Sequence, residues 1–136
     1  MKILLILFFT PLQLIAQNFS NAEVSCWEKQ ATSVTIIRDN YGIPHIYGKT
    51  DADAVFGLLY AQCEDDFKRV EMNYIEKLGR MAEIKGKNAF YEDLLMRMII
   101  DTAEAVQDYN QAPGWMKDLC NAFADGINYY LYKHPD

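Results

Sequence analysis

The alternation of apolar and polar residues first predicts a β-hairpin. Residues 34–38 form an apolar, β-branched run, turn-forming residues occupy 39–42, and a second short apolar run follows at 43–47. Pro44 cannot donate a hydrogen bond within a sheet, so the second strand lies at an edge or begins at Pro44. Because an isolated hairpin is only marginally stable in water, we expect these strands to join a larger sheet.

A long helix is predicted next. Thr50 and Asp51 are good starting residues, because their side chains accept hydrogen bonds from the free amides of a first turn, and Gly79 is the expected end. The helix would contain about 28 residues and measure roughly 42 Å. Such a length predicts that it crosses a larger body. Its apolar residues recur at steps of three or four and are Ala52, Val55, Leu59, Cys63, Phe67, Val70, Tyr74 and Leu78.

Further helices are predicted after this one. Residues 80–85 form a short turn or helix that Gly86 ends, and a second helix covers 91–106. After the break at Pro113, a last helix continues to near His134. We expect another layer of protein to cover this last helix, because its apolar surface extends to more than one side. Three tyrosines widen that surface, Tyr129, Tyr130 and Tyr132.

The N-terminal residues have the layout of an export signal. Residues 1–16 combine a basic start, a short apolar core and a small residue, Ala16, at a plausible cleavage position, as secretory signal peptides do. The apolar run is too short for a spanning helix and contains Pro11, so we expect export to the periplasm and no membrane anchor. Residues 17–33 are polar and patternless, which predicts a mobile lead-in. The length of residues 34–136 suits one domain or one piece of a larger one.

Composition and charge exclude several classes of partner. The 136 residues carry a formal net charge of −6, with 24% charged and 51% hydrophobic residues, which is a globular balance. An acidic chain has no general electrostatic attraction to nucleic acid or to an anionic membrane surface. The three cysteines allow one disulfide with a free thiol, or three buried thiols. Cys63 and Cys120 fall on apolar helical stripes, so we expect both to be buried.

Taken alone, the residue types predict no catalytic centre and no metal site. The serines all lie in the expected lead-in, which cannot hold a nucleophile in place. Cys63 and His45 form a better pair on paper, but the apolar stripe around Cys63 indicates a buried, unreactive thiol. In the acidic triplet 64–66, neighbouring side chains on a helix point about 100° apart and cannot converge on one ion.

Two ion pairs are expected among the remaining charged residues. Asp65 or Asp66 should pair with a basic residue one turn later, Lys68 or Arg69. Arg38 is expected to form a buried ion pair with its neighbour Asp39 that fixes the hairpin, because the arginine fork matches a carboxylate.

Three stretches in fixed order carry a family resemblance. Residues 34–46 contain the pattern RD-x-x-G-x-PHI, residues 57–67 contain G-x-x-x-AQ-x-x-D, and residues 79–86 contain GR-x-AE-x-x-G. Together they resemble the opening of the penicillin acylase family, a group of N-terminal-nucleophile hydrolases that includes acyl-homoserine-lactone acylases. The similarity extends more loosely to Pro135. The matching positions are Arg38, Asp39, Gly42, Pro44, His45, Gly57, Ala61, Gln62, Asp65, Gly79, Arg80, Glu83 and Gly86.

The resemblance implies a fold and a chemistry. It implies the α+β class, with the N-terminal portion of an αββα sandwich seen here as a short β-hairpin followed by mainly helices. Family members are exported precursors that cleave themselves into an α chain and a β chain. The first residue of the β chain is the nucleophile and its own α-amino group is the general base. They hydrolyse linear amides, of the penicillin or acyl-homoserine-lactone type, through an acyl-enzyme that an oxyanion hole stabilises.

For this chain the resemblance implies the role of a scaffold. Residues 34–136 would then be an incomplete domain, the N-terminal part of the α chain. The nucleophile would lie on the β chain, so this chain alone is expected to be inactive. The matching residues are then architectural and not catalytic. No cofactor is expected in this chain, and calcium belongs to the complete enzyme. The expected partners are the β chain of the same precursor and a small-molecule amide substrate.

Two other interpretations stay open at this point. One is a small exported helical binding module without catalysis, and the other is a decayed acylase remnant with no present function. A binding module would unfold cooperatively on its own, whereas an acylase fragment would be loosely packed or aggregate, because its last helix lacks a covering layer. Thermal unfolding of residues 17–136 distinguishes the binding module from the fragment.

Overall fold

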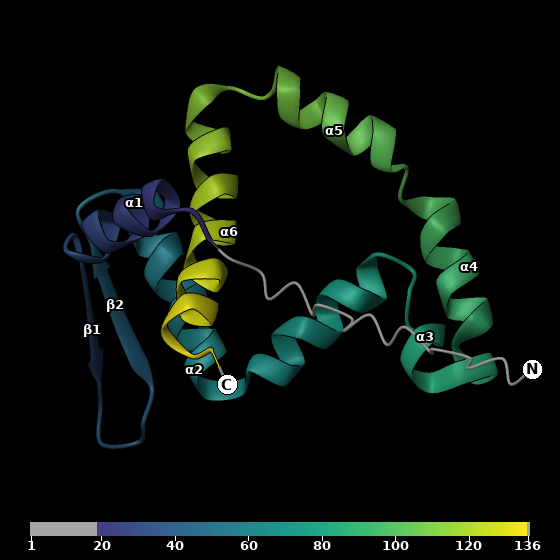
Figure 1. Ribbon diagram of the computed structural model, residues 1–136, viewed down its shortest axis with the longest axis horizontal. Coiled ribbons are helices and arrows are strands. Elements are labelled where there is room, and N and C mark those ends of the chain that lie inside the picture. The colour runs from purple at the N-terminus through teal and green to yellow at the C-terminus, as the bar shows by residue number, and fades with distance from the viewer. Residues whose placement is uncertain (1–18, 136) are drawn as a thin grey trace, which may run out of the picture.

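The computed structural model describes residues 19–135. Its strands are β1 (Val34–Arg38) and β2 (Pro44–Gly48), its helices are α1 (Asn21–Ala31), α2 (Asp51–Lys77), α3 (Ala82–Lys85), α4 (Phe90–Ile99), α5 (Thr102–Gln111) and α6 (Gly114–Lys133), and a short 3-10 helix covers Gly86–Ala89. The predicted α+β class, a β-hairpin followed by mainly helices, is confirmed (Figure 1). The predicted signal peptide, residues 1–16, lies outside the described residues. Among the helices of 19–135, none has the length and apolar character needed to cross a membrane.

The predicted hairpin forms, and it packs on a helix. Strands β1 and β2 are antiparallel, with Val34 opposite Gly48 and Arg38 opposite Pro44, so the second strand begins at its proline as predicted. Within the described residues these two strands make up the whole sheet. The larger sheet that the sequence predicted is therefore not found there. Helix α2 covers one face of the hairpin and gives it the apolar support that an isolated hairpin lacks.

Helix α2 begins as predicted but is not continuous. Thr50 and Asp53 form a capping box, because each side chain accepts a hydrogen bond from the other residue's amide. At Asp66 the backbone leaves the helical region, with φ of −160° and ψ of 76°. The Asp66 carboxylate accepts a hydrogen bond from the Arg69 amide at 3.1 Å, as a residue that starts a new helical segment does. It also pairs with the Arg69 guanidinium at 3.3 Å, which confirms one of the expected ion pairs.

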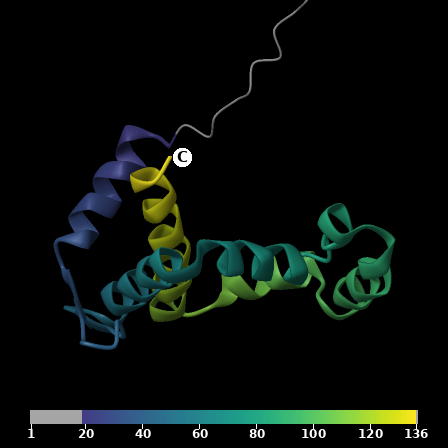
Figure 2. The same ribbon diagram turned by 90° about the horizontal axis from the view of Figure 1, so that it is seen from below.

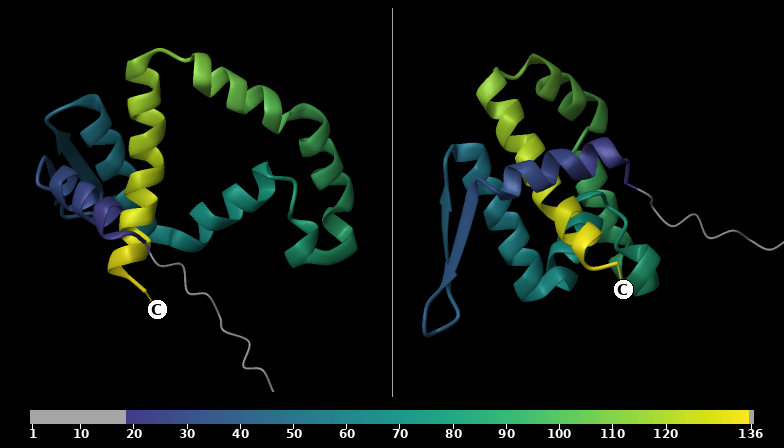
Figure 3. Two further views of the ribbon diagram at one scale, coloured as in Figure 1. Left: turned by 45° about the horizontal axis from the view of Figure 1, so that its top comes forward. Right: turned by 60° about the vertical axis from the view of Figure 1, so that its left-hand side comes forward.

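Helix α1 replaces the mobile lead-in expected for residues 17–33, and that prediction is wrong where the helix forms. Ser20 and Glu23 make a capping box, with the Glu23 amide 3.3 Å from Ser20 Oγ and the Ser20 amide 2.9 Å from the Glu23 carboxylate. Trp27 is 3% exposed, and its Nε1 donates to Asp125 Oδ1 at 2.8 Å. Trp27 therefore anchors α1 to α6. Helix α1 lies across α6 (Figure 3).

The core lies where α2 and α6 cross. One cluster contains Trp27, Phe56 and Ala122, and a second contains Leu59, Cys63 and Ile127. Helix α6 ends close to the predicted position and rests on α2. Tyr129 and Tyr130 are partly covered by aromatic neighbours from α2, as in the stacked pair of Tyr130 and Phe67 with ring centres 5.4 Å apart, whereas Tyr132 is exposed. The tyrosine-rich side of this helix therefore finds part of its expected covering layer within the chain.

The segment between α2 and α6 differs from the prediction. In place of one helix over 91–106, the chain forms α4 and α5, with a break at Ile100 and Asp101. The Asp101 side chain accepts from the Ala103 amide at 2.8 Å, so it starts a new helix although the apolar periodicity of the sequence continues past it. Helices α3 and α4 lie at one end of the molecule and the hairpin lies at the other (Figure 2).

Candidate functional site

The first motif closes a tight turn around Asp39. Its Oδ1 accepts hydrogen bonds from the amides of Tyr41 at 2.8 Å and Ile43 at 3.0 Å, and its Oδ2 lies 3.3 Å from His45 Nε2. The hydrogen bond from the Ile43 amide contributes most to holding the pKa of this carboxyl below its ordinary value. The Tyr41 amide and the His45 ring act in the same direction. Gly42 has a φ of 82°, a conformation that favours glycine. These residues therefore fix the hairpin turn.

Arg38 joins this turn to α2. Its Nη1 donates to the Gly42 carbonyl at 2.9 Å and lies 2.7 Å from Asp65 Oδ1, while its Nη2 lies 3.1 Å from Glu64 Oε2. The expected buried ion pair between Arg38 and Asp39 is wrong, because Asp39 is held by backbone amides and Arg38 turns to the helix. The Arg38 side chain is also one-third exposed. Its planar fork thus connects the first motif with the second.

The second motif supplies small residues where the hairpin meets α2. A Cβ atom at Gly57 would come within 2.5 Å of Val34 Cγ1 and 2.9 Å of Ile46 Cγ2, so only glycine lets the strands lie this close. Ala61 has no exposed surface, whereas the neighbouring Gln62 is exposed. The first two motifs therefore meet in space and form one joint between hairpin and helix.

The third motif forms a separate joint at the far end of α2. Gly79 has a φ of 62°, and its carbonyl accepts from Arg97 Nε at 3.0 Å. Arg80 Nε and Nη2 each donate to a carboxylate oxygen of Glu83 at 2.7 Å. Gly86, with a φ of 69°, ends α3. Because α3 lies at the opposite end of α2 from the hairpin, this motif does not share a site with the first two (Figure 1).

Asp93 is the residue of this second joint that the sequence analysis missed. It is 8% exposed, and its two oxygens accept from the amides of Met81 at 2.8 Å and Ala82 at 2.7 Å. Asp93 and Arg97 are four residues apart, so they share one side of α4. Their spacing in the sequence could have indicated a shared contact. In the structure, both side chains dock α4 onto the turn that contains the third motif.

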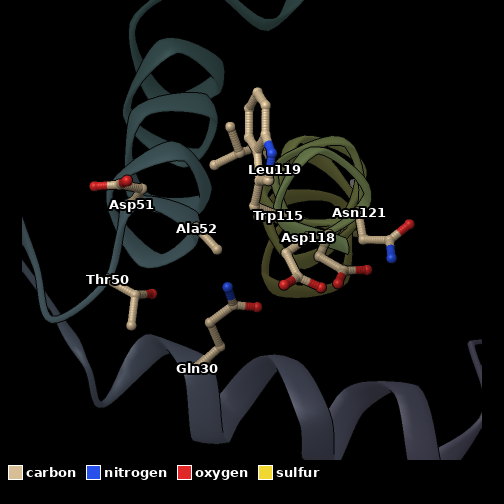
Figure 4. A pocket seen from close by; sticks show the side chains of 10 residues that line it. Gln30, Thr50, Asp51, Ala52, Trp115, Asp118, Leu119 and Asn121 are labelled. Atoms are coloured by element: carbon tan, nitrogen blue, oxygen red, sulfur yellow. The ribbon is translucent and has the colours of Figure 1, made fainter. Parts of the chain in front are cut away.

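A surface hollow of about 450 Å³ lies between α1, the start of α2 and α6. In Figure 4, Gln30 reaches from α1 toward the space between Ala52 and Asp118. Asp125, also in the lining, accepts the hydrogen bond from Trp27. The one hydroxyl among the described residues that line the hollow, that of Thr50, donates to Asp53 Oδ2 at 2.9 Å as part of the cap of α2. The lining residues are Gln30, Thr50, Asp51, Ala52, Trp115, Asp118, Leu119, Asn121, Ala122 and Asp125.

The three cysteines are free. Cys63 is 1% exposed, as predicted, and burial raises the pKa of its thiol to about 11, which disfavours the reactive thiolate. Cys26 and Cys120 are exposed. The predicted burial of Cys120 is therefore wrong, because Ala122 and Gly126 turn the other side of α6 toward α2. Across residues 19–135, no three His, Cys, Asp or Glu side chains are grouped to hold a metal ion.

Comparisons with known proteins agree with this arrangement. Residues 33–136 match the family model described as penicillin amidase. The chain is 32% identical over 106 residues to acyl-homoserine lactone acylase QuiP of Pseudomonas syringae pv. tomato, which is 78% of this chain and 13% of that protein. It is 31% identical over 108 residues to penicillin G acylase of Escherichia coli, again 78% of this chain but 12% of the relative. The chain thus spans about an eighth of the length of these curated relatives.

A solved structure shows the same fold. The thermostable penicillin G acylase of Alcaligenes faecalis superimposes on this structure with a TM-score of 0.67 at 24% sequence identity. The match covers 76% of this chain and 56% of that chain. The hairpin and helices described above therefore have the fold of an N-terminal-nucleophile hydrolase, as the sequence resemblance implied.

Proposed function

Because this chain belongs to the penicillin amidase family, we propose that it is part of the α chain of an exported, periplasmic enzyme that hydrolyses linear amides. The proposed substrates carry acyl groups of the penicillin or acyl-homoserine-lactone type. A β chain cut from the same precursor supplies the N-terminal nucleophile. The observation that carries this proposal is that one family match, over residues 33–136, includes all three motifs in order.

The contacts of the motif residues support a scaffold role. Arg38 is paired with carboxylates of α2, and Asp39 is bound to two backbone amides and to His45. Gly57 gives the strands access to α2, and Gly79 turns the chain at the far joint. Every one of these residues is therefore occupied in holding one element to another.

The proposed reaction is an acyl transfer to the β-chain nucleophile. That nucleophile attacks the amide carbonyl, its own α-amino group takes the proton, and an oxyanion hole stabilises the tetrahedral intermediate. The amine then leaves with a proton, and water hydrolyses the acyl-enzyme to release the acid. In this proposal residues 19–135 position the surrounding elements, and Cys63, buried with its pKa near 11, takes no part as a nucleophile.

Calcium is proposed only for the complete enzyme. We place calcium outside residues 19–135 because, within them, no three His, Cys, Asp or Glu side chains are grouped to hold a metal ion. The carboxylates at the first joint are also already engaged, since Glu64 and Asp65 both pair with Arg38.

A chimaera tests the proposed function. Residues 33–136 replace the matching segment of the Pseudomonas syringae relative, and the product is assayed for hydrolysis of an acyl-homoserine lactone and of penicillin G. We expect the chimaera to hydrolyse at least one of the two amides, because the segment carries the same joints. The chain of residues 1–136 on its own is expected to hydrolyse neither, and the relative without its matching segment serves as the second control.

Two outcomes would reject the proposal. A soluble, folded chimaera that leaves both amides intact would show that this segment cannot serve in an acylase. Hydrolysis by the isolated chain at the rate of the relative would show that the reactive groups lie within residues 1–136, and not on a β chain.

A further inference from the structure

Helix α4 leaves its apolar half exposed, unlike an ordinary surface helix. At 100° per residue, six apolar side chains occupy one continuous half of the helix. All six are exposed, by between 46% and 80% of their surface, and none carries a charge. We call this surface the α4 face, and its members are Phe90, Tyr91, Leu94, Leu95, Met98 and Ile99.

On the opposite side of α4, Asp93 faces the protein, while Glu92 and Arg97 stay exposed and Met96 is half-buried. Asp93 is 8% exposed and bound to two backbone amides, and Arg97 donates to the Gly79 carbonyl. A helix on the surface of a soluble domain normally turns its charges to water and its apolar stripe to the core. Here the turn around Gly79 needs polar partners, so Asp93 is drawn inward and the apolar side is left outside.

We propose that the α4 face is covered by the remainder of the acylase polypeptide, a partner that presents an apolar protein surface. This inference rests on the function proposed above. The chain matches only 13% of the length of its Pseudomonas syringae relative, so most of such an enzyme is available to supply the cover. An uncharged face of six large side chains is the kind of surface that stable protein interfaces bury.

The charge around α4 disfavours a membrane as the occupant. Helices that lie on membranes carry several Lys or Arg residues on the polar side. The polar side of α4 holds Glu92 and Asp93 with a single arginine, Arg97, and that arginine is bonded to Gly79. The whole chain is also acidic, with a formal net charge of −6. A lipid surface and a second copy of this chain are therefore outcomes of the test and not the occupant proposed.

Nitration of tyrosine by tetranitromethane measures the cover directly. Tyr91 on the α4 face is 80% exposed, and Tyr41 in the hairpin turn is 90% exposed, so the two form a matched pair. In the isolated chain of residues 1–136 we expect both to react at similar rates, read by mass spectrometry against added N-acetyltyrosine amide. In the chimaera we expect Tyr91 to react roughly tenfold more slowly, because an apolar interface excludes the reagent.

Other results would overturn the inference. Tyr91 that keeps its rate in a folded chimaera shows an uncovered α4 face, and equal protection of Tyr41 shows burial that is not specific to α4. Protection of Tyr91 in the isolated chain by phosphatidylcholine vesicles identifies a membrane as the occupant. Protection that grows with the concentration of the isolated chain identifies a second copy.

A substitution separates cover by a partner from packing within the chain. Leu94→Glu places a charge in the α4 face, and Ile43→Glu, at a 56% exposed apolar residue of the hairpin turn, is the control. We expect the isolated Leu94→Glu chain to keep its melting temperature, as the control does, and the Leu94→Glu chimaera to lose protection of Tyr91. A lower melting temperature for isolated Leu94→Glu alone would mean that α4 packs within this chain, and would overturn the inference.

Failure of this inference is distinguishable from failure of the proposed function. A chimaera that hydrolyses an amide but leaves Tyr91 reactive retains the function and rejects the cover. A chimaera that protects Tyr91 but hydrolyses neither amide retains the cover and rejects the function. A chimaera that does not fold counts against both.

Discussion

Gly126→Ala tests the crossing of α2 and α6 on which the core depends. A Cβ atom at Gly126 would lie 2.5 Å from the carbonyl oxygen of Phe56 and 3.1 Å from Leu59 Cβ. Ordinary contact begins near 3.4 Å, so the helices must separate by about 0.9 Å at this point. The obstacle is a backbone atom within a helix, which cannot turn aside as a flexible side chain does.

The expected cost follows from two opposing effects. Forcing extra volume into a packed core costs about 1–3 kcal/mol, and a backbone obstacle places this case at the upper end. Alanine is favoured over glycine inside a helix by about 1 kcal/mol, which offsets part of that cost. The net loss in the free energy of unfolding is therefore about 2 kcal/mol. For a chain of this size, such a loss lowers the melting temperature by roughly 6–10 °C.

Far-ultraviolet circular dichroism of the chain during urea and thermal unfolding measures this loss. Gly114→Ala is the matched control, because it lies in the same helix and its added Cβ would meet no atom within 4 Å. We expect Gly114→Ala to leave the stability unchanged or slightly raised. If Gly126→Ala proves as stable as Gly114→Ala, then α2 and α6 do not approach as closely as described, and the reasoning about the core is refuted.

Three further predictions concern single side chains. Trp27→Phe removes the hydrogen bond to Asp125, and we expect chemical unfolding to show a loss of about 1–3 kcal/mol. Burial raises the pKa of the Cys63 thiol from 9.0 to about 11, so iodoacetamide at mildly alkaline pH should alkylate Cys120 well before Cys63. The same shift favours the thiolate only in the unfolded chain, so stability should fall as pH rises from 9 toward 11. Asp93→Asn weakens the acceptor of two amides at the start of α3, which should cost about 1–2 kcal/mol and speed hydrogen exchange there.

Each of these predictions has a control within the chain. Trp115→Phe changes the same residue type at a position that is 61% exposed, so it should leave the stability unchanged. Glu92→Gln neutralises an exposed carboxylate next to Asp93 and should not affect the amides of α3. A control that lowers the stability as much as the substitution it is paired with would contradict the contacts described. Equal alkylation of Cys63 and Cys120 would contradict the burial of Cys63.

Local patterns in the sequence were enough for the hairpin and for the two ends of each of the longest helices, α2 and α6. Strand β1 ends at Arg38 and β2 begins at Pro44, as alternation and the missing proline amide predict. Helix α6 ends at Lys133, within a residue of its expected end near His134. In these segments the apolar period and the residues that begin or end each element agree, so the neighbours in sequence decide the structure.

The errors occur where a capping side chain interrupts or starts a helix without a change in apolar pattern. Ser20 starts α1 in a polar segment that has no clear apolar stripe. Asp66 and Asp101 each bind a backbone amide inside a run whose apolar period continues past them. Periodicity and capping compete at these positions, and the contacts made by the rest of the chain decide between them. A single sequence does not contain the strength of those contacts.

The candidate site shows a related limit. The resemblance marked the positions of the three motifs, but the carboxylates that Arg38 binds lie 26 and 27 residues further along the chain. Sequence neighbours suggested Asp39 as the partner of Arg38, and the fold brings Glu64 and Asp65 closer. Ion pairs of this kind depend on how a strand lies on a helix, which the local sequence does not determine.

The same reasoning explains why a motif rich in charged residues need not mark an active site. A tight turn leaves backbone amides without partners, and a carboxylate such as that of Asp39 or Asp93 satisfies two of them at once. An arginine then ties each turn to the next element, as Arg38 and Arg97 do. Charged residues at fixed spacing from glycine are thus what these two turns require. In α4, the turn's need for an acceptor draws Asp93 inward and so leaves the apolar side of the helix outside. The residue that forms this joint thereby also creates the surface proposed for a partner.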